Sequence, residues 1–123
     1  MIRADLPWPP SVNRYWRRTD TRRTALTDRA LKFRRDVQDS LLEQLGAGWR
    51  THINPDARFA ITIAAHPPDR RKRDLDNLLK PTLDALEHAL VFTDDSQVDD
   101  LHITRASVRK RGRLTLEIRE ATG

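Results

Sequence analysis

The segment from residue 59 to residue 90 constrains the fold most, because its apolar repeat changes along its length. Apolar side chains first recur at every second position, which predicts a strand with one buried face: Phe59, Ile61, Ile63 and Ala65. Pro67 and Pro68 end this alternation, since proline has no N–H for a strand ladder. A stripe at helical spacing follows, which predicts a helix with a buried face: Leu79, Leu83, Leu86 and Leu90. We therefore expect the chain to pass here from a strand into a helix.

Two carboxylates stand at this junction, Asp74 and Asp76. In a helix, residues two apart point about 200° away from each other, whereas on an extended backbone they face the same side. Asp76 is also a favourable N-cap for the helix that follows. The pair is therefore expected where extended backbone turns into helix, with both side chains on one side.

Lys80 and Asp95 add to this pair the elements of a metal site that acts on phosphate. A cation in the first turn of a helix opposes the helix dipole by about 0.3–1 kcal/mol, and such departures from local rules concentrate at functional sites. If Asp95 joins Asp74 and Asp76, carboxylates about 4 Å apart repel by about 4 kcal/mol at an effective dielectric constant of about 20. A divalent cation removes this repulsion, and oxygen ligands suit Mg²⁺ or Mn²⁺.

An ordinary structural explanation exists for each of these residues. An Asp-x-Asp pair before a helix can serve only as a cap, and Asp94-Asp95-Ser96 can be a simple turn. Lys80 can pair with Asp84 four residues later on the same helix face. Spacing alone leaves both explanations open, and the nearby basic residues favour the functional one.

Length and composition predict a single domain, residues 1–123, with a polyanionic partner. The net charge is +5, from 23 Lys and Arg against 18 Asp and Glu, and the pI is about 10.4. Such a balance is typical of nucleic-acid-binding proteins. The absence of cysteine excludes disulfides and a Cys-ligated zinc site. No apolar run approaches the roughly 20 residues of a membrane span and the N-terminus lacks a signal-peptide core, so a cytoplasmic protein without membrane contact is expected. No small-molecule cofactor is expected.

Two basic segments are candidates for DNA contact. One interleaves arginine with aromatic residues, which suits phosphate pairing and base stacking, and the other directly precedes the carboxylate pair. The alternative is that the tryptophans pack a loop onto the core while the arginines are merely solvated. The candidate DNA-binding residues are Asn13, Arg14, Tyr15, Trp16, Arg17, Arg70, Arg71, Lys72 and Arg73.

The remaining patterns predict more strands and a first long helix. Alternation predicts strands over residues 2–6, 98–109 and 114–118, the last two joined as a closing hairpin that turns at Arg111-Gly112. Thr27 or Asp28 caps a helix that runs to about residue 45, where Gly46 stops it. The buried stripe of this helix is Ala30, Phe33, Val37, Leu41 and Leu45.

Pro81 leaves the course of the second helix open. A proline beyond the first turn removes a hydrogen bond and clashes, at a cost of about 3 kcal/mol. Either the helix restarts at Pro81 after a short turn, or it is kinked there. The expected fold class is α+β: one small domain in which a mixed β-sheet is packed by two main helices.

Four blocks of sequence resemble the RusA family of Holliday junction resolvases: residues 9–16 (PPSVNRYW), 74–80 (DLDNLLK), 83–86 (LDAL) and 94–98 (DDSQV). The resemblance implies a small homodimeric, Mg²⁺-dependent endonuclease. It also implies that Asp74, Asp76 and Asp95 are the catalytic, metal-binding acidic residues. Lys80 would be the essential lysine, with Asp94 beside the site, and Pro81 directly after Lys80 is the departure that could redirect this side chain.

The function that the resemblance implies is resolution of Holliday junctions by paired symmetrical nicks, in DNA recombination and repair. The expected partner is four-way branched DNA, bound by a homodimer whose two-fold symmetry matches that of the junction. Two alternatives stay open: a less selective nuclease for branched DNA, and a non-catalytic DNA-binding protein that uses its acidic residues as caps.

Overall fold

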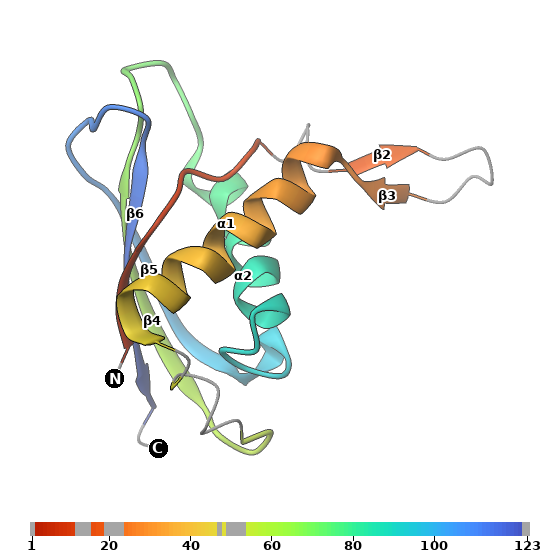
Figure 1. Cartoon of the computed structure of the whole chain (residues 1–123). Helices are drawn as coiled ribbons and strands as arrows, with labels where there is room; N and C mark the ends of the chain where they lie inside the picture. The colour runs from red at the N-terminus through yellow and green to blue at the C-terminus, as the bar shows by residue number, and fades with distance from the viewer. Residues whose placement is uncertain (1, 12–15, 19–23, 47, 49–53, 122–123) are drawn as a thin grey trace.

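Alternating apolar residues build the main sheet of the computed structural model, which describes residues 2–11, 16–18, 24–46, 48 and 54–121. The sheet has four strands in the order β1-β6-β4-β5, namely β1 (Ile2–Leu6), β6 (Arg113–Glu120), β4 (Phe59–His66) and β5 (Val98–Arg105). A separate pair, β2 (Trp16–Arg18) and β3 (Thr24–Leu26), extends away from the rest of the chain (Figure 1). The helices α1 and α2 lie on one face of the main sheet, so the expected α+β class with a mixed sheet and two helices is confirmed.

The strand pairing corrects the predicted hairpin. β5 pairs in parallel with β4, whereas β6 lies between β1 and β4 and is antiparallel to both. The physical reason is burial: Leu114, Leu116 and Ile118 of β6 are fully buried and need a central strand, whereas the charged and exposed Asp99 and Asp100 suit β5 to an edge. β5 also ends at Arg105, four residues earlier than expected.

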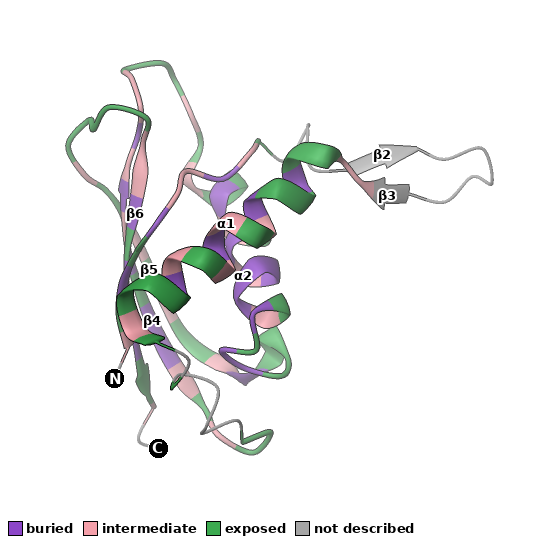
Figure 2. Ribbon diagram, viewed as in Figure 1, coloured by how far each residue is buried: buried purple, intermediate pink, exposed green. Residues whose placement is uncertain are grey.

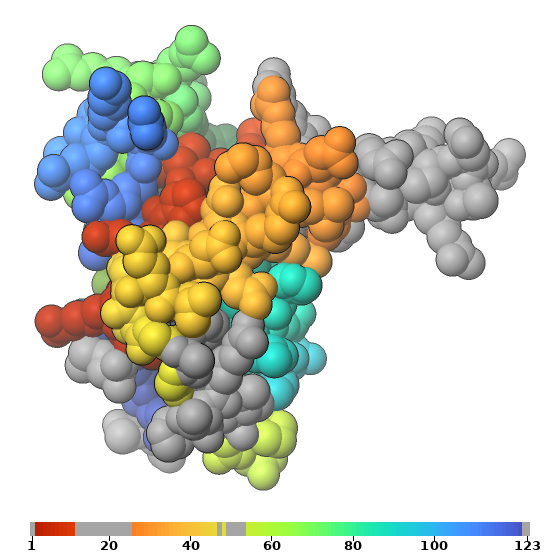
Figure 3. Space-filling view, in the orientation of Figure 1, coloured from red at the N-terminus to blue at the C-terminus, as the bar shows by residue number. Residues whose placement is uncertain are grey.

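Helix α1 (Asp28–Leu45) forms as the sequence predicts. The Thr27 side chain accepts a hydrogen bond from the backbone N–H of Ala30, and Gly46 ends the helix at a positive φ of 68° that favours glycine. Its expected stripe faces the sheet, with Leu45 half-buried and the others buried: Ala30, Phe33, Val37 and Leu41. In the space-filling view α1, yellow to orange, runs across the front of the molecule (Figure 3).

Helix α2 (Leu79–His88) follows a short 3₁₀ turn, η3 (Leu75–Leu78), which settles the question of Pro81. Pro81 is the third residue of α2, where a backbone N–H would have no partner within the helix, so no hydrogen bond is lost. The expected N-cap was wrong: Asp74 caps η3 by position, Leu78 precedes α2, and Asp76 lies inside η3.

The predicted leucine stripe is confirmed at Leu86, holds in part at Leu79 and Leu83, which pack against the core, and is wrong at Leu90. Because α2 begins only at Leu79, the buried face is shifted and is formed by Pro81, Thr82, Asp84, Ala85 and Leu86. Leu79 and Leu83 are half-buried, and Leu90 lies beyond the helix with a φ of 63° and 43 % of its surface exposed. Figure 2 shows the buried residues gathered between the helices and the sheet. Within the described residues, no helix is long and apolar enough to cross a membrane.

Candidate active site

Asp74 and Asp76 stand at the strand-to-helix junction, as the sequence predicts. Asp74 has an extended backbone (φ −92°, ψ 133°) and precedes η3, where its carboxylate makes no capping hydrogen bond. Asp76 is the second residue of η3, and both residues are exposed. A carboxylate that occupies a cap position without capping is open to another partner.

Lys80 lies in the first turn of α2 and pairs with Asp84. The Lys80 Nζ is 3.2 Å from an Asp84 carboxylate oxygen, which is the i,i+4 pair that the structural explanation expects. The two side chains differ in exposure, with 55 % of the Lys80 side chain but only 11 % of the Asp84 side chain accessible. The ammonium group therefore stays within reach of solvent and of a ligand.

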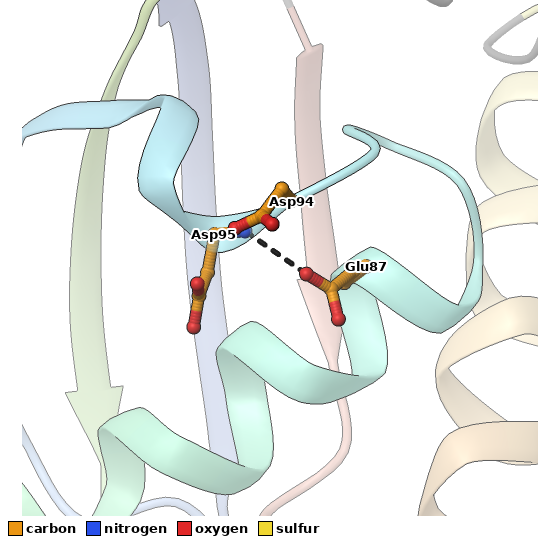
Figure 4. Close-up of side chains that lie close together, drawn as sticks. All are labelled: Glu87, Asp94 and Asp95. Atoms are coloured by element: carbon orange, nitrogen blue, oxygen red, sulfur yellow. Dashed lines mark hydrogen bonds between the residues drawn. The ribbon is translucent and has the colours of Figure 1, made fainter. Parts of the chain in front are cut away.

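Asp94 and Asp95 lie before β5, beside the C-terminal half of α2. The Asp94 carboxylate accepts a hydrogen bond from the Ser96 backbone N–H at 2.8 Å, and this bond lowers the pKa of Asp94. Asp94 is thus the N-cap of the short 3₁₀ turn η4 (Asp95–Gln97), which agrees with the purely structural explanation of this residue. Glu87 of α2 accepts the backbone N–H of Asp95 at 3.0 Å (Figure 4). The side chain of Asp95 itself is exposed.

Glu87, Asp94 and Asp95 form an acidic group, with ligand oxygens that all lie within 4.8 Å of one another. Among the residues that the structure describes, Asp74 and Asp76 do not belong to it. The single chain therefore presents two separate sets of acidic residues, one before α2 and one after it, and does not bring Asp95 to the other two.

Gln97 organises the loop that carries Asp94 and Asp95. Its side-chain oxygen accepts hydrogen bonds from the Thr93 N–H (2.9 Å), the Thr93 hydroxyl (2.7 Å) and the Asp94 N–H (3.1 Å). Its amide nitrogen donates to the carbonyls of Asn54 (2.8 Å) and Ala57 (2.9 Å). Since Gln97 is only 2 % exposed, these five bonds satisfy a buried amide and tie the loop to the chain before β4.

The second basic segment lies directly before Asp74. Arg70, Arg71 and Lys72 are exposed, whereas Arg73 is half-buried, donates to the Asp69 carboxylate at 2.7 Å and lies 5.9 Å from the centre of the Trp8 ring. The Arg73 hydrogen bond, followed by the Arg71 backbone N–H, lowers the pKa of Asp69 to about 2. Arg73 thus has an evident structural role, and the three exposed residues are the ones open to a phosphate backbone.

The first basic segment is only partly described. Asn13, Arg14 and Tyr15 lie outside the described residues, and Trp16 and Arg17 are described only as backbone of β2. A pocket of about 360 Å³ opens between the start of this segment and the Asp74 junction. Its lining combines an indole, two cations and an amide beside a carboxylate: Trp8, Pro9, Ser11, Lys72, Arg73, Asp74, Asn77 and Leu78.

Two residues of these sites were not predicted from the sequence. Gln97 had a local signal, because an Asp N-cap followed three residues later by Gln is a capping-box pattern, and that box is present. Glu87 had none, since its approach to Asp95 depends on how the loop after α2 folds back.

The sequence of the chain matches the model of a known protein family. A family model described as endodeoxyribonuclease RusA matches residues 7–119. The chain belongs to this family, as the sequence blocks indicated.

Several known proteins are similar to this chain over almost its whole length. The crossover junction endodeoxyribonuclease rusA of Enterobacteria phage HK97 is 42 % identical over 115 residues, and that of Enterobacteria phage 82 is 41 % identical. The crossover junction endodeoxyribonuclease RusA of Escherichia coli K12 is 40 % identical over 119 residues. Each comparison covers 94 % of this chain and 91 % of the relative.

Proposed function

We propose that the chain is a Mg²⁺-dependent endonuclease that resolves Holliday junctions by paired symmetrical nicks. The observation that carries this proposal is the exposed Asp74, Asp76 and Lys80, next to exposed cations, in a chain of the RusA family. Mn²⁺ is the expected substitute for Mg²⁺. The enzyme is expected to act in the cytoplasm, in DNA recombination and repair.

The donor chemistry of the proposed site fits a hard divalent cation. Asp74, Asp76 and Asp95 all offer exposed carboxylate oxygens, the ligand type that Mg²⁺ and Mn²⁺ prefer. A bound Mg²⁺ supplies Lewis-acid activation of water and charge stabilisation at the phosphate. The role of the three carboxylates would be to hold the cation beside the scissile phosphodiester bond.

Lys80 and the exposed cations have separate roles in the proposed reaction. Water attacks phosphorus and the bond to the 3′ oxygen breaks, which leaves a 5′ phosphate and a 3′ hydroxyl. The Lys80 ammonium neutralises the charge that develops on the phosphate, after it exchanges Asp84 for the phosphate oxygen. Arg70, Arg71 and Lys72 hold the DNA backbone, so affinity is expected to fall steeply with salt.

Cleavage of a synthetic four-way junction with Mg²⁺ tests the proposal. Asp76→Asn is expected to bind the junction but to lose cutting, and Lys80→Ala is expected to lose about 10²–10³-fold in cutting rate. Asp39→Asn is the matched control, because it removes an exposed carboxylate from the outer face of α1 and should leave cutting unchanged. Full cutting by Asp76→Asn would show that this residue is not part of the site.

The same assay separates the two rival functions. A less selective branched-DNA nuclease would cut flaps and forks as fast as four-way junctions and would not place its nicks symmetrically. A non-catalytic DNA-binding protein would cut nothing, and Mg²⁺ would not raise its melting temperature.

A further inference from the structure

Two loops lie together at the end of the main sheet that leads to Asp74. The β4 loop, residues 67–73, follows β4, and the β5 loop, residues 105–112, runs from the last residue of β5 to the start of β6. The ribbon and space-filling views show the two loops, green and blue, side by side at the upper left of the molecule (Figures 1 and 3). Cations of the β4 loop hold DNA in the proposed function, whereas the β5 loop has no role in it.

Hydrogen bonds to the backbone fasten the β5 loop to the β4 loop. The Arg109 N–H donates to the carbonyl of Pro67 at 3.0 Å. The Arg105 guanidinium donates to the carbonyl of Arg73 at 2.7 Å, directly before Asp74. The β5 loop is therefore held at a fixed position beside the junction that carries the carboxylates.

The two loops concentrate the positive charge of the chain. Residues 69–73 include four cations and one carboxylate, and residues 105–112 include four cations and no carboxylate. Their joint net charge of +7 exceeds the +5 of the whole chain, so all other residues together carry −2. Seven of the eight cations are exposed: Arg70, Arg71, Lys72, Arg105, Arg109, Lys110 and Arg111. A surface this basic attracts a polyanion.

Within the described part of the chain, the cations at residues 109–111 have no carboxylate partner. Asp69, the one carboxylate of the two loops, is held by Arg73 at 2.7 Å. The ion pairs between described residues include none of Arg109, Lys110 and Arg111. These three charges therefore neutralise no acidic group of the described chain and are open to a ligand.

Arg111 also occupies a backbone position that favours other residues. Its φ is 70°, and Gly112 after it has a φ of 72°, so this turn places two residues in the left-handed region. Gly, Asn and Asp adopt that region more readily than arginine does. The chain thus keeps a long cationic side chain at a strained position, and such strain concentrates at functional sites.

We propose that the β5 loop binds the phosphate backbone of a double-stranded DNA arm, on one continuous surface with residues 70–72. This inference rests on the proposed function, because it places an arm of the junction beside Asp74. Neither loop contains an aromatic residue that could stack on unpaired bases, which favours a duplex over a single strand. Cations that contact phosphates position the DNA and do not read its sequence.

The salt dependence of junction binding tests the proposal. The loop variant carries Arg109→Gln, Lys110→Gln and Arg111→Gln. Its affinity for a fluorescent four-way junction is measured by anisotropy in EDTA, between about 50 and 200 mM KCl. Since each lost phosphate contact lowers the slope of log K against log salt by about 0.9, the slope should fall by about 3. At about 100 mM KCl the loop variant should bind at least about tenfold more weakly, whatever the sequence of the arms.

A control variant removes the same charge elsewhere. It carries Arg3→Gln, Arg35→Gln and Arg119→Gln, three exposed cations of β1, α1 and β6. Arg3 and Arg119 lie at the opposite end of the main sheet, where Ile2 pairs with Ile118. The control variant should keep the wild-type slope to within about one.

Arg111→Asn separates lost binding from misfolding. Because asparagine adopts the left-handed region more readily, the urea midpoint should rise by about 0.5 M. Junction binding should nevertheless weaken by about threefold, with a slope lower by about 0.9. Arg111→Lys keeps the charge and should bind as the wild type does.

The outcomes separate this inference from the proposed function. Wild-type affinity and slope in the loop variant, or equal losses in the loop and control variants, would overturn the role of the β5 loop. A loss for single-stranded DNA but not for a duplex would overturn the choice of a duplex arm. At saturating concentration the loop variant should still cut at the wild-type kcat, because Asp74, Asp76 and Lys80 are unchanged. A wild-type chain that binds junctions but does not cut them would overturn the proposed function and leave the binding surface intact.

Discussion

Replacement of Gln97 by leucine tests whether this buried amide holds the Asp94–Asp95 loop in place. Leucine has a similar size but can make none of the five hydrogen bonds of the Gln97 amide. At about 0.5–1.5 kcal/mol each, these bonds contribute about 2.5–7.5 kcal/mol. The buried leucine returns about 1.5 kcal/mol, and water can reach some of the partly buried partners. We expect the free energy of unfolding to fall by about 3 kcal/mol.

Urea denaturation measures this loss directly. With an m-value of about 1.5 kcal/mol per molar, a loss of about 3 kcal/mol lowers the midpoint by about 2 M. Gln38→Leu is the matched control, because Gln38 is half-buried on α1, and its midpoint should move by less than about 0.4 M. Gln97→Glu keeps the acceptor oxygen but turns a carboxylate oxygen toward the carbonyls of Asn54 and Ala57, so its midpoint should fall at least as far as that of Gln97→Leu.

A loss below about 1 kcal/mol for Gln97→Leu would refute the reasoning. It would mean that Thr93 and Asp94 find other partners for their N–H groups, and that the loop does not depend on the buried amide.

Two further predictions concern the loops around Trp8. Gly112 has a φ of 72°, and an added Cβ would lie 2.8 Å from the Trp8 Cβ, so Gly112→Ala should lower the free energy of unfolding in urea by about 2–4 kcal/mol. The control is Gly46→Ala, which should lower it by only about 1–2 kcal/mol, because Gly46 has a φ of 68° but no atom within 4 Å of the added Cβ. Equal losses for the two variants would exclude the Trp8 contact as a cause. The lowered pKa of Asp69 means that its ionised form is stabilised in the folded chain, so this contribution is complete above pH 4 and is lost as the pH falls toward about 2. In a chain with Trp16→Phe and Trp49→Phe, Trp8 is the one remaining tryptophan, and its fluorescence should change as Asp69 is protonated. Asp69→Asn should abolish this fluorescence change. If the change persists in Asp69→Asn, another group causes it.

The parts of the fold that depend on local pattern could be predicted from the sequence. Thr27 and Gly46 bound α1 through local capping interactions, and the apolar alternation of β1 and β4 needs only one buried face. The partner of β5 could not be predicted in this way. Its parallel pairing with β4 depends on α2 crossing between them, and the sequence shows only a turn at Arg111-Gly112.

In the candidate site, too, only the features that depend on local sequence could be predicted. Local spacing predicts that Asp74 and Asp76 lie where extended backbone turns into helix, and the exposed Asp74 precedes η3 with an extended backbone. That Asp76 lies inside η3 could not be predicted in this way. The phase of α2 does not follow, because a 3₁₀ turn of four residues precedes it and moves Leu90 out of the core. The distance of Asp95 from the other two carboxylates also depends on strand direction, which no local pattern encodes.

The position of β6 has a consequence for synthesis of the chain. Among the described strands β6 follows all the others along the chain, yet it lies between β1 and β4 and pairs with both. Until residues 113–120 have left the ribosome, β1 has no strand to pair with in the main sheet. A chain that stops before residue 113 therefore cannot complete the main sheet or its hydrophobic core, and such a product is expected to be degraded rather than to be a partly active nuclease.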